Sequence, residues 1–533
     1  MRKITILLLS CMLPQSILYA KKKSKRPNII FIMSDDHTSQ AIGAYNSRLA
    51  PLNPTPTIDR IGNEGVIFEN AFCTNSICTP SRACIMTGQY SQTNGVLDLS
   101  QPLAPEKLYL ATEMKTLGYQ TAIVGKWHLH KRPETFDYYN VFYGQGKYYD
   151  PILVEKGMTS MVPRKAAGAH KEKGKEVPGK RYKGHSSDVV TDITLDWLKN
   201  KRDKSKPFFL MHHFKAPHDM FVFNRKYENY LEDTYIPEPA SMYYDGNHGS
   251  IATRGLNDQM KDSIGSSVGK RNSIRNMGKH MKIDPNLSDM EYKHAAYQEY
   301  LKRYLRCVKG VDDNVKRLFD YLEQNNLMDN TIIIYTGDQG FWLGEHDYID
   351  KRWMYEESMR MPFLVRYPKT IRAGSRSDAI INNTDFAPTI IELAGGKKPK
   401  QMQGESFAEI ITKGKEPKNW KQETYYRYWA HMMHHQNPGH FGIRTKEYKL
   451  IFFYGLHFKD AAMKSKRVWQ TTPGWELYDL KKDPQEMNNC YNDPRYSKVV
   501  KDLKSRLHQL RVDLNETDEN YPKIDKIIEE NWN

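Results

Sequence analysis

Three features are scarce or missing in this chain of 533 residues. Cysteine occurs six times, which is too few for a disulfide framework to stabilise a protein of this size. No apolar segment reaches the roughly 20 residues that a membrane-spanning helix needs. We also find neither an internal repeat nor a low-complexity tract. These absences favour a soluble globular protein, and the length allows one large domain and a smaller one.

The charge balance is basic, with 79 lysine and arginine residues against 63 aspartate and glutamate residues and a formal net charge of +16. The pI is about 9.2 and the hydrophobic fraction is 39%. A basic surface fits an anionic partner, either a nucleic acid or an acidic polysaccharide, or it serves solubility alone. Composition alone does not distinguish between these three explanations of the basic charge.

The first 20 residues have the pattern of a secretory signal peptide. Arg2 and Lys3 precede an apolar stretch at 4–9, and Ala20 precedes a run of lysines, so cleavage is expected near Ala20. Cys11 follows a Leu-Leu-Ser sequence that faintly resembles a lipoprotein site. Apolar residues continue beyond it, which favours ordinary export. We therefore expect a periplasmic or secreted protein.

Two continuous apolar runs, residues 28–33 and 331–336, are typical of parallel strands buried on both faces. Between them, helical patterns (108–117, 188–199, 289–322) alternate with extended ones (119–124, 207–213). This alternation predicts an α/β domain over residues 27–404, with a large mixed, mostly parallel sheet sandwiched by helices. Residues 235–286 are rich in Gly, Asn, Ser and Lys and are expected to form loops near the mouth of a site.

Beyond residue 404 the pattern changes to short aromatic-rich segments at 425–429, 441–445, 448–454 and 475–478. Such segments predict a small antiparallel sheet. A helical pattern at 496–514 follows. Residues 405–533 are therefore expected to form a smaller C-terminal subdomain, an antiparallel sheet plus a helix.

The most informative segment is the sequence CTPSRACIMTG at residues 78–88. Pro80 suits the first turn of a helix, and Gly88 suits its end. Cys78 would then lie at a helix N-terminus, where backbone N–H groups and the helix dipole favour an anion. Arg82, one turn later, can direct its positive charge to the same point. An isolated Cys-x-Pro would more often be a helix start with a buried cysteine.

The longer string resembles the signature of the type I sulfatases, within the alkaline-phosphatase-like superfamily, and the likeness extends from about residue 27 to residue 479. Within this family the chain resembles bacterial carbohydrate sulfatases of the N-acetylglucosamine-6-sulfatase type. In the family the motif cysteine is oxidised to Cα-formylglycine (3-oxoalanine), so the resemblance implies this change at Cys78 by a formylglycine-generating maturation enzyme. One hydroxyl of the hydrated aldehyde attacks sulfur, and the other then expels sulfate, which a plain thiol ester could not do without a separate hydrolysis.

Acidic and amide side chains follow both apolar runs, with Asp35 and Asp36 after the first and Asp338 and Gln339 after the second. Sites in open α/β sheets form beyond the carboxyl ends of strands. Oxygen ligands of this kind suit a hard divalent cation. The resemblance implies that these four residues, with an oxygen of modified Cys78, bind one calcium ion. The family more often has Asn at the position of Gln339.

The resemblance assigns four further residues in motifs that appear in the family's order. Gly-Lys-Trp-His places Lys126 and His128 in the active centre, and Ala-Pro-His makes His218 the acid that protonates the leaving oxygen. Lys351 matches a lysine that contacts a sulfate oxygen, and Arg82 would orient the hydrate. Without the resemblance, a lysine or a histidine in a loop would be read as a solvated side chain.

These observations predict an exported sulfatase that hydrolyses sulfate monoesters on carbohydrate, with no nucleic-acid partner. By likeness to exo-acting relatives we expect a terminal sulfated hexose or hexosamine, with galactose-type sugars slightly favoured. A loop at 430–440, rich in polar rings, suggests His435 and His440 as sugar-binding residues. The alternatives are a surface loop without a ligand and, for the whole chain, a phosphonate monoester or phosphodiester hydrolase, or an inactive glycan-binding relic.

Overall fold

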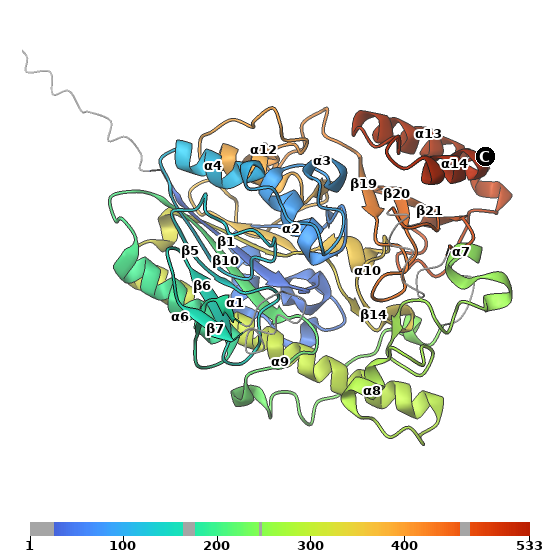
Figure 1. Cartoon of the computed structure of the whole chain (residues 1–533), viewed down its shortest axis with the longest axis horizontal. Coiled ribbons are helices and arrows are strands. Elements are labelled where there is room, and N and C mark those ends of the chain that lie inside the picture. The colour runs from blue at the N-terminus through green and yellow to red at the C-terminus, as the bar shows by residue number, and fades with distance from the viewer. Residues whose placement is uncertain (1–25, 164–175, 245–247, 459–469) are drawn as a thin grey trace, which may run out of the picture.

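The computed structural model describes residues 26–163, 176–244, 248–458 and 470–533. Its centre is a ten-stranded sheet (Figure 1). In spatial order its strands are β17 (Ser375–Ser377), β2 (Val66–Phe68), β16 (Phe363–Arg366), β12 (Thr331–Gly337), β1 (Asn28–Asp35), β10 (Phe208–Pro217), β4 (Gln120–Gly125), β5 (Tyr138–Phe142), β6 (Ile152–Glu155) and β9 (Lys180–Arg181). The central strands β12, β1, β10, β4 and β5 are parallel, while β16 and β6 flank them antiparallel. The predicted mixed sheet is confirmed.

Helices cover both faces of this sheet (Figure 1). Along β1, Ile30 and Ile32 point to one face and Ile29, Phe31 and Met33 to the other, all at most 1% exposed. Each such side chain contributes roughly 1.5–3 kcal/mol by burial, which explains the uninterrupted apolar run. One face carries α1 (Pro56–Asn63), α6 (Ser186–Asp196) and α9 (Asp289–Gln324), and the other α2 (Cys78–Thr87), α4 (Tyr109–Thr116), α11 (Phe386–Leu393) and α12 (Ala408–Lys413).

The C-terminal part contains a four-stranded antiparallel sheet, as predicted. Its strands are β19 (Glu423–Tyr428), β20 (His440–Thr445), β21 (Tyr448–Phe453) and β22 (Gly474–Asp479). Helix α13 (Ser497–Asp513) covers it, and α14 (Pro522–Asn531), which was not predicted, follows. The backbone N–H of Arg427 in β19 donates to the carbonyl of Thr74 at 3.0 Å. The small sheet therefore contacts the segment that leads into Cys78.

The described residues of the insertion at 235–286 contain more helix and strand than the expected loops. It contains α7 (Ile251–Arg254), begun by a capping box at Ser250, and α8 (Met277–Met281), capped by the side chain of Asn276. Its strand β11 (Ser266–Ser267) pairs with β14 (Tyr348–Asp350), which ends immediately before Lys351. The insertion thus borders the predicted site, as expected, through a strand pair that its composition did not reveal.

Two expectations concern the chain's relation to membranes and export. The signal peptide at residues 1–20, with Cys11, lies outside the described residues. Among the residues that are described, none of the helices combines the length and the apolar character of a membrane-spanning segment. All five cysteines in the described ranges are unbridged.

Candidate active site

Apart from Lys351, which follows β14, the predicted catalytic and metal-binding residues lie at the carboxyl ends of the parallel strands and in the first turns of α2. Asp35 ends β1, and Asp338 follows β12 directly. Lys126 follows β4, and His218 follows β10. Because β12, β1, β10 and β4 are neighbours in the sheet, residues about 300 positions apart in sequence meet at one edge.

Cys78 is the first residue of α2, and the helix ends at Gly88 in the left-handed region (φ 65°). Both features match the sequence prediction. Arg82, 2% exposed, donates from Nε to Asp338 Oδ2 at 2.9 Å and from Nη1 to the carbonyl of Lys126 at 2.8 Å. Burial raises the pKa of the Cys78 thiol to about 12, with Lys351 acting in the opposite direction. The helix start and its arginine therefore face the edge that carries the carboxylates.

Three buried carboxylates, those of Asp35, Asp36 and Asp338, have oxygens within 4.8 Å of one another. Within the described part of the chain, Asp35 Oδ1 and Gln339 Oε1 are buried without a hydrogen-bond partner. Burial raises the pKa of Asp36 to about 7, although Lys351 opposes the shift. Crowded anionic oxygens and an orphaned amide oxygen are the donor set that a hard divalent cation uses, so these residues fit a metal ion.

Two lysines accompany the carboxylates. The ammonium of Lys126 forms an ion pair with Asp35, and that of Lys351 lies 2.6 Å from Asp36 Oδ2. Burial lowers the pKa of Lys126 well below its usual value. Burial acts in the same direction on Lys351, but the charge of Asp36 outweighs it and raises the pKa of Lys351. Each lysine is therefore held against one of the carboxylates at this edge of the sheet.

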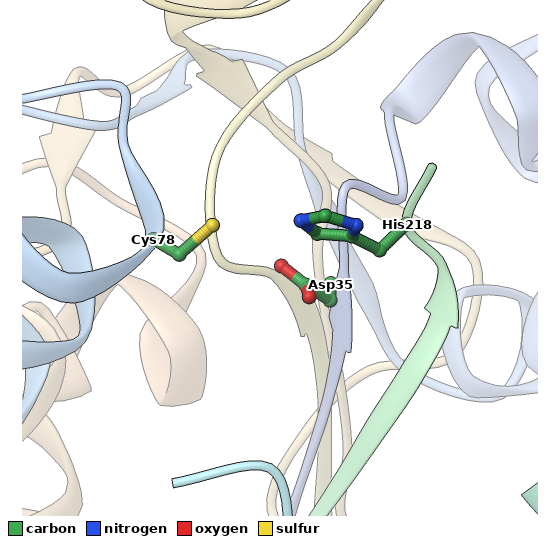
Figure 2. A group of neighbouring side chains, drawn as sticks. All are labelled: Asp35, Cys78 and His218. Carbon is green, nitrogen blue, oxygen red and sulfur yellow. The ribbon is translucent and has the colours of Figure 1, made fainter. Parts of the chain in front are cut away.

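His218 points toward Cys78 and Asp35 (Figure 2), and ligand atoms of the three residues lie within 4.8 Å of one another. Its Nδ1 is 2.5 Å from Asp219 Oδ1, and its Nε2 is 3.9 Å from Asp36 Oδ2. Burial lowers the pKa of His218 to about 3, with Asp219 opposing. Asp219 thus holds Nδ1, which leaves Nε2 facing the site.

His128 lies beside the start of α2. Its Nδ1 is 3.3 Å from Thr79 Oγ1, and the same hydroxyl donates to the carbonyl of His128 at 3.0 Å. Burial lowers the pKa of His128 well below its usual value, and Lys126 acts in the same direction. The structure thus brings all the predicted catalytic and metal-binding residues together.

The two predicted sugar-binding histidines have different surroundings. His435 contacts Ser266 of the insertion (Nδ1–Oγ 2.7 Å) and lies 3.6 Å from Asp350, next to Lys351. His440 is fully buried in the first position of β20, where its ring packs against Phe453 with centroids 4.8 Å apart. His440 has no exposed surface for a sugar, so the prediction for His440 is not supported, whereas His435 borders the site.

Sequence reasoning missed three residues that shape the site. The hydroxyl of Tyr304 in α9 donates to the carbonyl of Asp36 at 2.7 Å, and the amide of Asn383 donates to Ser81 Oγ at 3.0 Å. Tyr304 lies in a helix whose apolar pattern indicates only core packing, and Asn383 lies in a short polar segment that carries no recognisable motif. Asp219 was the one residue with a local signal, because it is an acid directly after the Ala-Pro-His motif.

The sulfatase family model matches residues 27–396, more than half of the chain. The chain belongs to the sulfatase family. A second family model, the C-terminal region of N-sulphoglucosamine sulphohydrolase, matches residues 344–513 of this sulfatase.

Relatives match most of the length of this sulfatase. It is 36% identical to an N-acetylglucosamine-6-O-sulfatase of Bacteroides thetaiotaomicron, over 96% of this chain and 90% of the relative. It is 27% identical to the N-acetylglucosamine-6-sulfatase of Capra hircus, over 77% and 67% of the two chains. Among solved structures, BT4656 in complex with its substrate D-glucosamine-2-N,6-O-disulfate superposes with a TM-score of 0.77 at 36% identity, over 93% and 99% of the chains. The predicted alkaline-phosphatase-like fold and the sulfatase activity are confirmed.

Proposed function

We propose that this sulfatase is an exported, calcium- and formylglycine-dependent enzyme that removes the 6-O-sulfate from a terminal glucosamine residue of a sulfated glycan. The observation that carries the proposal is the convergence of Cys78, three carboxylates and the cations of Arg82, Lys126 and Lys351 at one buried point. A site of this kind neutralises a sulfate monoester and excludes water, which strengthens each electrostatic contact.

Two groups would complete the site. Asp35, Asp36, Asp338 and Gln339 would hold the calcium ion, which would neutralise sulfate oxygens. Formylglycine at Cys78 would supply the hydrated aldehyde that attacks sulfur, after action of a maturation enzyme. Export rests on the signal pattern at residues 1–20, for which a periplasmic or secreted location is our proposal.

The protein's own side chains would position and release the substrate. Lys126 and Lys351 donate to sulfate oxygens, and Arg82 orients the residue at position 78. His218 gives a proton from Nε2 to the sugar oxygen while Asp219 holds Nδ1. Because burial disfavours the imidazolium, the negative charge of the bound sulfate must support protonation of Nε2. His128 assists release of sulfate.

The substrate class follows from the relatives rather than from any one residue. Both named relatives are glucosamine-type 6-sulfatases, and the superposed structure holds a glucosamine disulfate. This favours glucosamine over the galactose-type sugar suggested by the sequence. The insertion pairs with the strand before Lys351 and contacts His435, so both border the site, and we propose that they limit it to the end of a glycan chain.

A panel of defined sugar sulfates tests the proposal. We expect kcat/KM for N-acetylglucosamine-6-sulfate to exceed that for galactose-6-sulfate at least about tenfold, because the two sugars differ both in the orientation of the C4 hydroxyl and in the substituent at C2, and polar side chains at the rim can distinguish either. A phosphonate monoester measured in parallel should be a poorer substrate. Preference for galactose-6-sulfate would refute the sugar assignment, and preference for the phosphonate would refute the reaction.

The proposed acid role of His218 predicts that its replacement slows hydrolysis of sugar sulfates much more than hydrolysis of aryl sulfates. In His218→Gln, turnover of a sugar sulfate should fall about 10²- to 10⁴-fold, since an alkoxide leaves poorly without a proton. An aryl sulfate, whose leaving group needs no proton, should lose only a few-fold in kcat. His212→Gln is a matched control, because His212 is buried in β10, the strand that His218 follows, with its Nδ1 2.8 Å from Thr194 Oγ1. Equal losses on both substrates in His218→Gln would remove the acid role.

A further inference from the structure

A third lysine lies at the site edge of the central sheet, and neither the family motifs nor the sequence analysis assigns it. Lys215 is on β10, two residues beyond His213, which pairs with Gly125 of β4. It is two residues before Pro217, which pairs with Asp35 of β1. Its backbone therefore lies between the strand ends that carry Lys126 and Asp35.

The side chain of Lys215 is held inside the site. It is 6% exposed, and its ammonium lies 5.1 Å from the ring centroid of Tyr148. The hydroxyl of Tyr148 donates to the carbonyl of His218. The aromatic ring thus positions the ammonium by a cation–π contact and connects it to the loop of the proposed acid.

Lys215 differs from the other two site lysines in its charge balance. Lys126 pairs with Asp35 and Lys351 with Asp36, whereas no carboxylate of the described residues forms an ion pair with Lys215. Two carboxylates act on Lys215 from a greater distance, but Asp219 is engaged by His218 and Asp36 by Lys351. A buried ammonium without a counter-charge is costly unless an anion joins it.

We propose that Lys215 contacts the sulfuryl group of the substrate as a third cation, on the side of His218. The ammonium keeps its proton and donates hydrogen bonds to sulfate oxygens, so no bond to it is made or broken. It would stabilise the charge that moves onto the sulfuryl and leaving oxygens in the transition state. The inference deepens the proposed function but depends only on sulfatase chemistry, not on the identity of the sugar.

Lys215→Gln and Lys215→Arg test the proposal on three substrates, an aryl sulfate, glucosamine-6-sulfate and glucosamine-2-N,6-O-disulfate. We expect Lys215→Gln to lower kcat/KM on the order of 10²-fold on all three, as loss of one stabilising donor does elsewhere. Lys215→Arg, which keeps the charge, should recover part of the loss. Bound metal per chain and the thermal midpoint should match the wild type.

Lys504→Gln is the matched control, because Lys504 also lies over an aromatic ring, 4.4 Å from the centroid of Trp475, outside the site. It should leave kcat/KM unchanged. Unchanged rates in Lys215→Gln, or loss of metal together with activity, would overturn the proposal. A loss confined to the disulfated sugar would also overturn it, because Lys215 would then bind a second anionic substituent. If the wild type turns over only the aryl sulfate, the sugar assignment fails while Lys215 is still tested on that substrate.

Discussion

Replacement of Cys78 by alanine is expected to abolish turnover, with a loss in kcat on the order of 10⁵- to 10⁶-fold, the range seen when a covalent nucleophile is removed. The residue at position 78 begins α2 and faces the carboxylates and cations that would hold a sulfate. Without a side chain to attack sulfur, those groups can bind the substrate but cannot cleave it. Steady-state hydrolysis of an aryl sulfate measures the loss.

Two variants sharpen this prediction. Cys84→Ala changes another buried cysteine of α2, one whose thiol contacts Thr74 and Ser91, and should keep wild-type kcat. Cys78→Ser retains a hydroxyl but lacks the second hydroxyl of a hydrate, so it should release at most one equivalent of product and then stop. Continued turnover by Cys78→Ala would exclude Cys78 as the nucleophile.

Replacement of Asp338 by alanine is expected to remove both the bound metal and the activity. Asp338 accepts from Arg82 at 2.9 Å and shares its site with Asp35 and Asp36. Burial alone would raise the pKa of Asp338, but the positive charges of Arg82 and Lys126 have the larger, opposite effect. The pKa of Asp338 is therefore lowered, and the carboxylate stays ionised. Its loss takes an anionic ligand from the metal and leaves Nε of Arg82 buried without its acceptor. Elemental analysis and aryl sulfate hydrolysis report the two effects.

A variant of a buried aspartate away from the site serves as a control that distinguishes loss of metal binding from loss of folding stability. Asp312 of α9 accepts from the backbone N–H of Thr57 at 2.9 Å and of Ile58 at 2.8 Å. Asp312→Asn should lower thermal stability while retaining one metal ion per chain and wild-type kcat/KM. Undiminished rates in Asp338→Ala, or in wild-type enzyme after exhaustive chelation, would contradict the metal assignment.

Local sequence patterns were sufficient to predict those site residues that lie at the end of a single strand or directly after it. The apolar run of β1 and the acids that follow it placed Asp35 and Asp36 correctly, because parallel strands share a carboxyl edge. Lys126 is completely buried, yet a lysine in a loop after a glycine reads as solvated. Only the family resemblance identified it, since its counter-charge, Asp35, lies 91 residues away.

Contacts between distant segments could not be read from the sequence. Tyr304 reaches the carbonyl of Asp36 across 268 residues, and nothing in the amphipathic pattern of α9 separates it from an ordinary core residue. The error at His440 has a similar cause, because the loop at 430–440 ends in a strand whose six residues are all buried. Helix α14 had a usable signal, since Pro522 begins it and Ile524 and Ile528 pack on one face.

The central claim, that an oxidised Cys78 performs the reaction, is tested most directly by mass analysis of the peptide containing residues 76–82 in preparations of different specific activity. Co-expression with increasing amounts of a formylglycine-generating enzyme supplies such a series. We expect kcat per chain to rise in proportion to the fraction of peptide carrying the aldehyde mass and to extrapolate to zero when no aldehyde is present. Full turnover by protein in which Cys78 is entirely unmodified would contradict it.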